Sequence, residues 1–137
     1  MKRVLIDTDI LSYFFKGDKN VVSNFETYLQ HYNLIEISII TYYEIAGGLL
    51  AKKALKQLSI FEAFIADNSV IPMTESSAKI SAELYSTLRQ SGKMLDDIDL
   101  LIAGIAIDNE LTLVTNNEGH FNRIPGLKIE NWLKHVL

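Results

Sequence analysis

The acidic residues of this 137-residue chain fall where a buried segment ends or a helix begins. Asp7 directly follows the apolar run at positions 4–6. Glu44 follows an isoleucine-rich segment, and Asp99 lies at the start of a long apolar stretch. Clustered carboxylates repel one another unless they are protonated or neutralised by a cation. A hard divalent cation such as Mg²⁺ takes oxygen ligands, activates water and stabilises charge on a phosphodiester. If the fold brings these carboxylates together, the chemistry they predict is metal-assisted hydrolysis.

The elements that must position the acids alternate between strand and helix. Short apolar runs predict strands, and apolar residues repeating every three or four positions predict helices. We expect strands at 3–7, 36–40, 70–73 and 111–115, with a short fifth at 128–129, and helices at 10–16, 20–32, from Thr41 onward, 52–66, 76–90 and 96–110. This alternation predicts an α/β fold of three layers, with a central parallel sheet of four to five strands flanked by helices.

The carboxyl edge of such a sheet is where a ligand crevice forms. Asp7 is expected at the end of the first strand and Glu44 in the first turn of the helix after the second. Asp99 is expected in the first turn of the helix that returns to the fourth strand, and Asn116 and Asn117 follow that strand. Asp7 is the hardest of these acids to explain structurally, because a carboxylate at the end of a buried strand needs a partner.

Helix capping is the competing explanation for the other acids. Asp9 is well placed to cap a helix beginning at position 10, and we favour that role for it. Thr41 and Glu44 have the spacing of a capping box, which explains Glu44 as well as a site role does. Asp96 is of a residue type that favours the N-cap position. The negative charge of Asp99 would be stabilised by the positive end of the helix dipole.

Composition narrows the class of protein. Seventeen acidic against 13 basic residues give a net charge of −4, which argues against binding nucleic acid by bulk electrostatics but allows a local contact through a metal ion. The absence of cysteine excludes disulfides and thiolate metal sites. The longest apolar run, 100–107, is far shorter than the roughly 20 residues of a membrane span. We therefore expect a single domain over 1–137 with no membrane association and a cytoplasmic location.

Four stretches of the chain resemble, in order and spacing, the PIN-domain ribonucleases, specifically VapC-like toxins of toxin–antitoxin pairs. They are DTDILSYFFKG, ISIITYYEIAGG, DIDLLIAGIAI and LTLVTNNEGHFNRIPGLKIENW. The resemblance covers essentially the whole chain. It implies that Asp7, Glu44 and Asp99 are the catalytic residues and bind Mg²⁺ or Mn²⁺ in an endoribonuclease. It also implies an RNA substrate, a homodimer and a cognate VapB-like antitoxin whose C-terminal tail occludes the site.

Two departures from the family pattern affect the site. Asp9 stands where the family commonly has Asn. No acid occupies the usual position two residues after Thr115, where this chain has Asn117. Asn117 is a candidate to position a metal-bound water, while Glu118 or His120 is a candidate to substitute for the missing acid. Thr115 is a further candidate, as a residue that supports a metal ligand.

Two other readings remain open on the sequence. Asp7 and Asp9 resemble the opening of haloacid-dehalogenase-type phosphatases, although the later acidic pair at 96–97 then precedes its strand instead of following it. A non-catalytic module with the PIN-like fold is the third class. On the ribonuclease reading, Arg89 and Lys93 are the candidate contacts for RNA phosphates.

Overall fold

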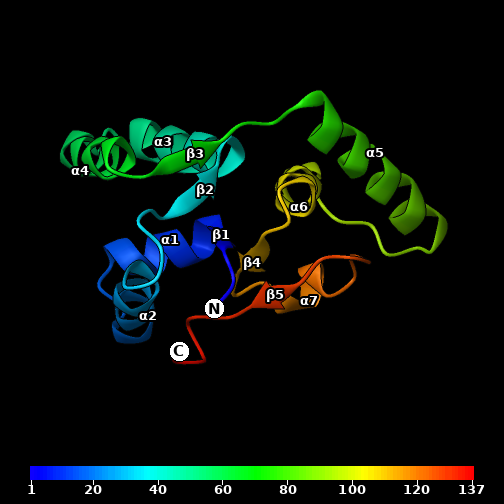
Figure 1. The fold of residues 1–137 in the computed structure, drawn as a ribbon. Helices are drawn as coiled ribbons and strands as arrows, with labels where there is room; N and C mark the ends of the chain where they lie inside the picture. Colours follow the sequence, from blue (N-terminus) through cyan, green and yellow to red (C-terminus); the bar gives the residue numbers. More distant parts are fainter.

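The five strands form one parallel sheet in the computed structural model, which describes residues 1–137 (Figure 1). The strands are β1 (Val4–Ile6), β2 (Glu36–Ser38), β3 (Ser69–Ile71), β4 (Thr112–Val114) and β5 (Ile129–Glu130). Their order is β3-β2-β1-β4-β5, so β1 is central, with Leu5 paired with Leu113 and Ile6 with Ile37. The predicted α/β class and parallel sheet are confirmed.

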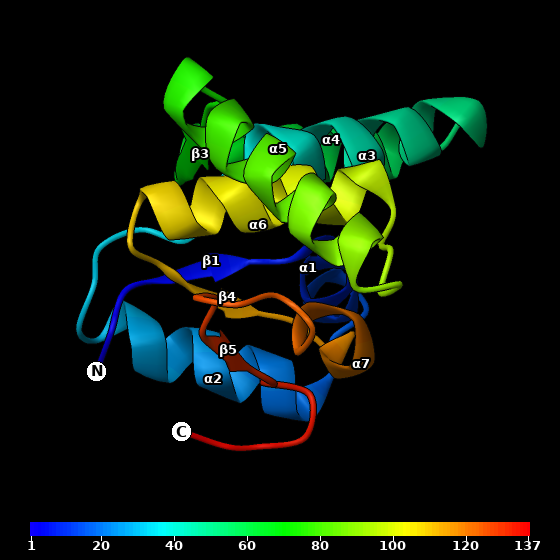
Figure 2. The same cartoon turned by 90° about the vertical axis from the view of Figure 1, so that its right-hand side faces the viewer.

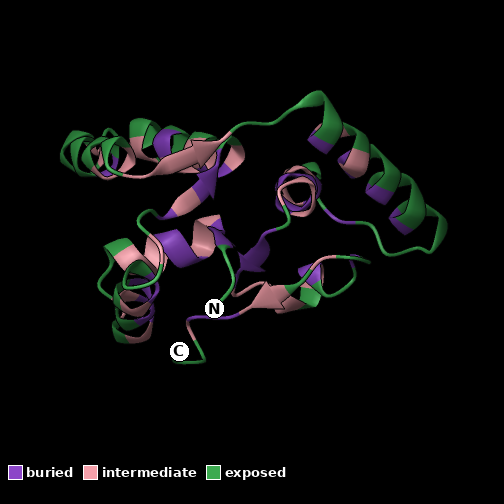
Figure 3. Ribbon diagram, in the orientation of Figure 1, coloured by how far each residue is buried: buried purple, intermediate pink, exposed green.

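Helices cover both faces of the sheet (Figure 2). They are α1 (Thr8–Phe15), α2 (Lys19–Leu29), α3 (Ile39–Ala51), α4 (Leu55–Ala66), α5 (Glu75–Gln90), α6 (Asp97–Asp108) and the short α7 (Glu118–Phe121). Successive side chains of a strand point to opposite faces. Accordingly Val4 and Ile6 pack in one core with Phe25 of α2, while Leu5 packs in the other with Ile105 of α6. The buried residues in Figure 3 follow this three-layer arrangement, and no helix is both long enough and apolar enough to cross a membrane.

The packing of α5 on α6 depends on a glycine. Gly104 of α6 is buried against α5, and an added Cβ there would lie 2.0 Å from Ser81 Oγ and 2.6 Å from the carbonyl oxygen of Ser77. Ser81 Oγ also donates to the carbonyl oxygen of Leu100 at 2.8 Å. The close approach of the two helices holds α6, and with it the acid in its first turn.

Helix α1 begins two residues earlier than its apolar pattern predicts. Asp7 is the N-cap, and its Oδ1 accepts the N–H of Thr8 at 2.8 Å. Asp9 therefore lies inside the first turn, where its Oδ1 accepts the N–H of Ile10 at 2.7 Å. The predicted capping role of Asp9 is wrong, because the end of β1 places Asp7 at that position.

Helix α3 also begins earlier than predicted. Ser38 is its N-cap, and Ser38 Oγ accepts the N–H of Thr41 at 3.0 Å. The predicted capping box is wrong because both Thr41 and Glu44 lie within the helix. The helix then continues through Gly47 to Ala51, so the next helix starts at Leu55 and not at position 52.

Candidate active site

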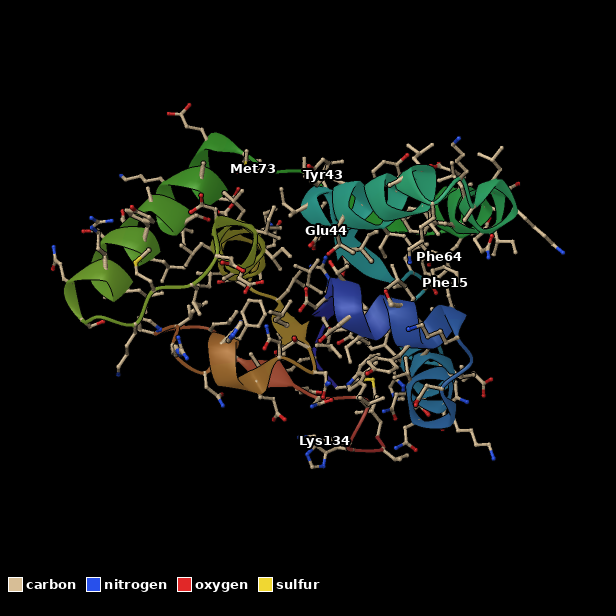
Figure 4. The ribbon with its side chains drawn as sticks, turned by 180° about the vertical axis from the view of Figure 1, so that it is seen from behind. Phe15, Tyr43, Glu44, Phe64, Met73 and Lys134 are labelled. Atoms are coloured by element: carbon tan, nitrogen blue, oxygen red, sulfur yellow. The ribbon has the colours of Figure 1, made fainter.

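A hollow of about 370 Å³ lies at the carboxyl edge of the sheet. Its lining contains no hydrophobic and no basic side chain; it consists of Asp7, Thr8, Asp9, Glu44, Asp99, Asn116 and Asn117. These residues come from the end of β1, the helices α1, α3 and α6, and the loop after β4. Figure 4 shows Glu44 on α3, above the start of α1. The fold thus gathers the three acids that the sequence singles out, with Glu44 in the second turn of its helix.

Asp7 is the most buried of these acids, with only 6% of its surface exposed. Its Oδ2 accepts the hydroxyl of Thr115 at 2.8 Å, while its Oδ1 accepts the N–H of Thr8. Burial, reinforced by the charge of Asp9, raises the pKa of Asp7 from about 3.8 to about 7 despite these hydrogen bonds. Near neutral pH, a positive charge in the hollow would favour the ionised form of Asp7.

Asp9 connects α1 to the loop after β4. Its Oδ2 accepts the backbone N–H of Asn116 at 3.1 Å, and its Oδ1 is held by Ile10. Burial raises the pKa of Asp9 as well. Both oxygens of Asp9 are therefore engaged by backbone groups, and the side chain fastens the β4 loop to the rim of the hollow.

Glu44 is held by a residue that sequence reasoning missed. The hydroxyl of Thr8 donates to Glu44 Oε1 at 2.6 Å. The signal was present in the sequence as a hydroxyl residue between two aspartates. Its partner lies 36 residues away on another helix, so local spacing could not reveal the contact.

Asp99 is half-buried and lies beside His120. The distance from Asp99 Oδ2 to His120 Nδ1 is 3.3 Å, and Asn117 Nδ2 lies 2.8 Å from the same ring nitrogen. Burial raises the pKa of Asp99, and the hydrogen bond and charge of His120 oppose that rise. The structure therefore brings Asn117 and His120 to the third acid, while their functional role stays a prediction.

Glu118 does not line the hollow. Its Oε2 accepts the amide of Asn131 at 2.9 Å and the ammonium of Lys134 at 3.4 Å, and these bonds lower the pKa of Glu118. Asn131, also missed from the sequence, is buried and donates to Asn116 Oδ1 at 3.0 Å. The structure directs Glu118 to this neighbouring network and gives no support to its role as the missing acid.

The candidate RNA contacts lie outside the lining of the hollow. Arg89 is exposed in the last turn of α5, where its Nη1 donates to Tyr85 Oη at 3.1 Å. Lys93 is exposed in the loop between α5 and α6. Their role as RNA contacts stays a prediction.

The chemistry of the donor set fits a hard divalent cation. The lining offers only carboxylate, amide and hydroxyl groups, and both burial and the charge of Asp9 raise the pKa of Asp7, its most buried carboxyl. In this structure no three acidic or histidine side chains lie near enough to one another to coordinate one ion. Binding would therefore require the half-buried carboxylates to rotate, while the buried Asp7 stays anchored by Thr115.

Comparison with known proteins places these residues in a family. The sequence model described as PIN domain matches residues 4–127. The chain belongs to the PIN-domain family. Ribonuclease VapC2 of Rickettsia felis is 34% identical over 131 residues, which cover 95% of this chain and 98% of that protein. The tRNA(fMet)-specific endonuclease VapC of Salmonella typhimurium is 35% identical over 99 residues, or 70% and 74% of the two chains.

Solved structures agree with the sequence relatives of this PIN domain. The crystal structure of VapBC2 from Rickettsia felis bound to a DNA fragment from their promoter matches with a TM-score of 0.86 and 34% identity, covering 94% of this chain and 98% of that one. DNA-bound VapBC from Salmonella typhimurium matches with a TM-score of 0.84 and 29% identity, covering 96% and 99%. The phosphatase reading loses its support, since no lysine lines the hollow and both oxygens of Asp9 are occupied by backbone N–H groups.

Proposed function

We propose that this PIN domain is a metal-dependent endoribonuclease and the toxin of a toxin–antitoxin pair. The observation that carries the proposal is the hollow into which β1, α3 and α6 bring Asp7, Glu44 and Asp99 with no basic side chain among them. A chain of nearly the same extent, 34% identical, is a VapC ribonuclease. The substrate is RNA, and the bond that breaks is a phosphodiester.

The three acids of the hollow and the residues beside them have different parts in that reaction. Asp7, Glu44 and Asp99 would hold Mg²⁺ or Mn²⁺, which when bound would supply an activated water and stabilise charge on the phosphate. Thr115 holds the carboxylate of Asp7, and His120 orients that of Asp99. These neighbours matter because groups that orient metal ligands typically affect metal affinity or activity by about 10–100-fold. Asn117 would orient a water bound to that ion.

A separate apolar groove suits the antitoxin. It has a volume of about 450 Å³ between α1, α3 and α4, and its apolar lining is Phe15, Ile45, Leu49, Ile60 and Phe61. Polar residues complete its lining: Ser12, Lys16, Lys52 and Gln57. Phe15 and Ile60 are 38% and 52% exposed, and exposed apolar side chains rimmed by polar ones suit a protein interaction site. We place the helical part of a VapB-like antitoxin in this groove, from which a tail carrying an arginine could reach the acidic hollow and pair with a carboxylate.

The proposed homodimer uses another surface. Tyr43, in the N-terminal half of α3, is 67% exposed, and Met73, in the β3–α5 connection, is 47% exposed. Figure 4 shows the two residues near each other at the top of the view. An aromatic and a methionine left in solvent fit the core of an interface between two copies. Sedimentation of Tyr43→Glu against wild type tests this, and an unchanged sedimentation coefficient would remove Tyr43 from the interface.

RNA cleavage by the purified protein is the test of the function. We expect labelled tRNA to be cut with Mg²⁺ or Mn²⁺ and to stay intact with EDTA. Asp99→Asn should abolish cutting while keeping the circular dichroism spectrum of the wild type. Glu44→Gln should also cut poorly, because it removes the charge of a metal ligand. Glu44 has no capping role in α3 that Gln could fill instead. Intact RNA with every cation, alongside a folded protein that binds its antitoxin, would favour the non-catalytic module.

A further inference from the structure

Three hydroxyl groups form a chain that ends on Glu44. Thr8 Oγ1 donates to Glu44 Oε1 at 2.6 Å. A hydroxyl has a single hydrogen, so Thr8 must accept in its 3.0 Å contact with Thr41 Oγ1. Ser38 Oγ in turn donates to Thr41 Oγ1 at 3.4 Å. Hydrogen counting therefore gives the chain one direction, from Ser38 through Thr41 and Thr8 to the carboxylate.

The beginning of this chain is rigidly held. Ser38 and Thr41 are fully buried, and Ser38 Oγ also accepts the N–H of Thr41 as the N-cap of α3. Hydrogen bonds in a buried chain polarise one another, and a member left without its partner is costly. Thr8 is the only one of the three hydroxyl residues that lines the hollow. Thr8 therefore links the buried end of β2 to Glu44, a half-buried acid of the hollow.

The bond to Thr8 settles the position of the Glu44 carboxylate. A glutamate side chain has three rotatable bonds and, on a helix surface, would sample several rotamers. A donor–acceptor distance of 2.6 Å is typical of a charge-assisted hydrogen bond to a carboxylate. Because Oε1 is occupied by Thr8, Oε2 is the oxygen left to meet a cation or its water.

We infer that Thr8 is a positioning residue, whose hydroxyl orients Glu44 toward the cation in the hollow. The inference rests on the proposed function, because it assigns Thr8 a part in the same metal site. Asp7, as N-cap, starts α1 at Thr8, and in this first turn the Thr8 hydroxyl meets Glu44 of α3. The two anchored acids are thus each held by one threonine, Asp7 by Thr115 and Glu44 by Thr8.

Cation titration of Thr8→Val and Thr8→Ser tests the inference. The melting temperature is measured against Mn²⁺ concentration for the wild type, both variants, and Thr112→Val, a matched change of a nearly buried threonine at the opposite edge of the sheet. We expect Thr8→Val to need about 10–100-fold more Mn²⁺ for half of the maximal shift. Thr8→Ser, which keeps the hydroxyl, and Thr112→Val should titrate like the wild type. A merely structural role would lower the melting temperature in EDTA without moving the Mn²⁺ midpoint.

The outcomes separate this inference from the proposed function. If Thr8→Val keeps the wild-type midpoint, or Thr8→Ser loses it as fully as Thr8→Val, the inference fails whatever the wild type cleaves. If the wild type binds Mn²⁺ with the expected ranking of variants but leaves RNA intact, the ribonuclease proposal fails and the role of Thr8 stands. A wild type whose melting temperature does not respond to any divalent cation overturns both.

Discussion

The acidic hollow and the apolar groove lie on the same two helices and differ completely in chemistry. The first turn of α1 contributes Thr8 and Asp9 to the hollow, and its last turn contributes Phe15 to the groove. On α3 the neighbours Glu44 and Ile45 line the hollow and the groove respectively. Consecutive residues of a helix project about 100° apart, so one pair of helices can serve two surfaces.

The contrast teaches how a toxin can be controlled without changing its active site. The hollow has no hydrophobic lining, so it offers a protein partner only polar and charged contacts. The groove supplies apolar area but no chemistry for hydrolysis. Affinity for a partner and reactivity toward RNA should therefore be separable by mutation.

Asp7→Asn should produce the largest effect, which should fall on RNA cleavage and leave antitoxin binding intact. It removes the charge of the best-anchored acid, so cleavage should fall by more than the roughly 100-fold typical of residues that only orient a ligand. Expression of the variant alone should not arrest growth, whereas the wild type should. Copurification with the antitoxin checks that the groove is intact. Growth arrest by a stably folded Asp7→Asn would contradict the assignment of the hollow.

Ile60→Glu should produce the reverse effect. Ile60 is 52% exposed on α4, so the change should not unfold the protein, yet it places a charge inside the groove. We expect antitoxin binding to weaken by about 2 kcal/mol, roughly 30-fold, while RNA cleavage by the free toxin continues. Titration calorimetry with the antitoxin measures this, with Leu34→Glu, 44% exposed outside the groove, as control. Equal losses in both variants would mean that the groove has no special role.

The pKa of Asp7 predicts an unusual pH dependence for the metal-free protein. A carboxyl whose pKa rises from about 3.8 to about 7 on folding holds its proton more tightly in the folded state. The contribution of Asp7 to stability should therefore be full below about pH 4 and should be lost, by on the order of 4 kcal/mol, as pH rises to about 7.5. Urea unfolding in EDTA at several pH values measures the slope.

Asp7→Asn is the control for that slope. The variant should lack most of the loss between pH 5 and 7.5 and should exceed the wild type in stability at the upper end. Divalent cation should raise the melting temperature of the wild type more at pH 7.5 than at pH 5, because only the ionised hollow binds it well. A wild type that becomes more stable toward pH 7.5 in EDTA would show that Asp7 is held ionised by the fold.

The smallest expected effect concerns the rim. Arg89→Ala or Lys93→Ala should weaken binding of RNA a few-fold and reduce the slope of log affinity against log salt by about 1 for each lost phosphate contact. Fluorescence anisotropy with a catalytically inactive Asp99→Asn background measures both quantities. Lys56→Ala, on the exposed surface of α4, should leave the slope unchanged. Equal slopes in all variants would place the RNA elsewhere.

The sequence by itself determined the class of fold and the edge at which the acids meet. Alternation of apolar runs with helical periodicity is a local property, and parallel strands place all their carboxyl ends together. The strand pattern was therefore enough to assign Asp7, Glu44 and Asp99 to one edge of the sheet. Separately, the motifs that resemble the family covered the whole chain. Boundaries of elements were less well predicted, because capping depends on single side chains, and Asp7 and Ser38 took the positions expected for Asp9 and Thr41.

Only the tertiary structure decided the strand order and which side chain holds which acid. The pairs Thr115–Asp7 and Thr8–Glu44 join residues 108 and 36 positions apart, and no local pattern encodes such distances. The same holds for Glu118, which the short helix α7 commits to Asn131 and away from the hollow. The residue types in the sequence showed which groups could bind a cation. Which of them remain available to do so follows from the hydrogen bonds that packing forms around each carboxylate.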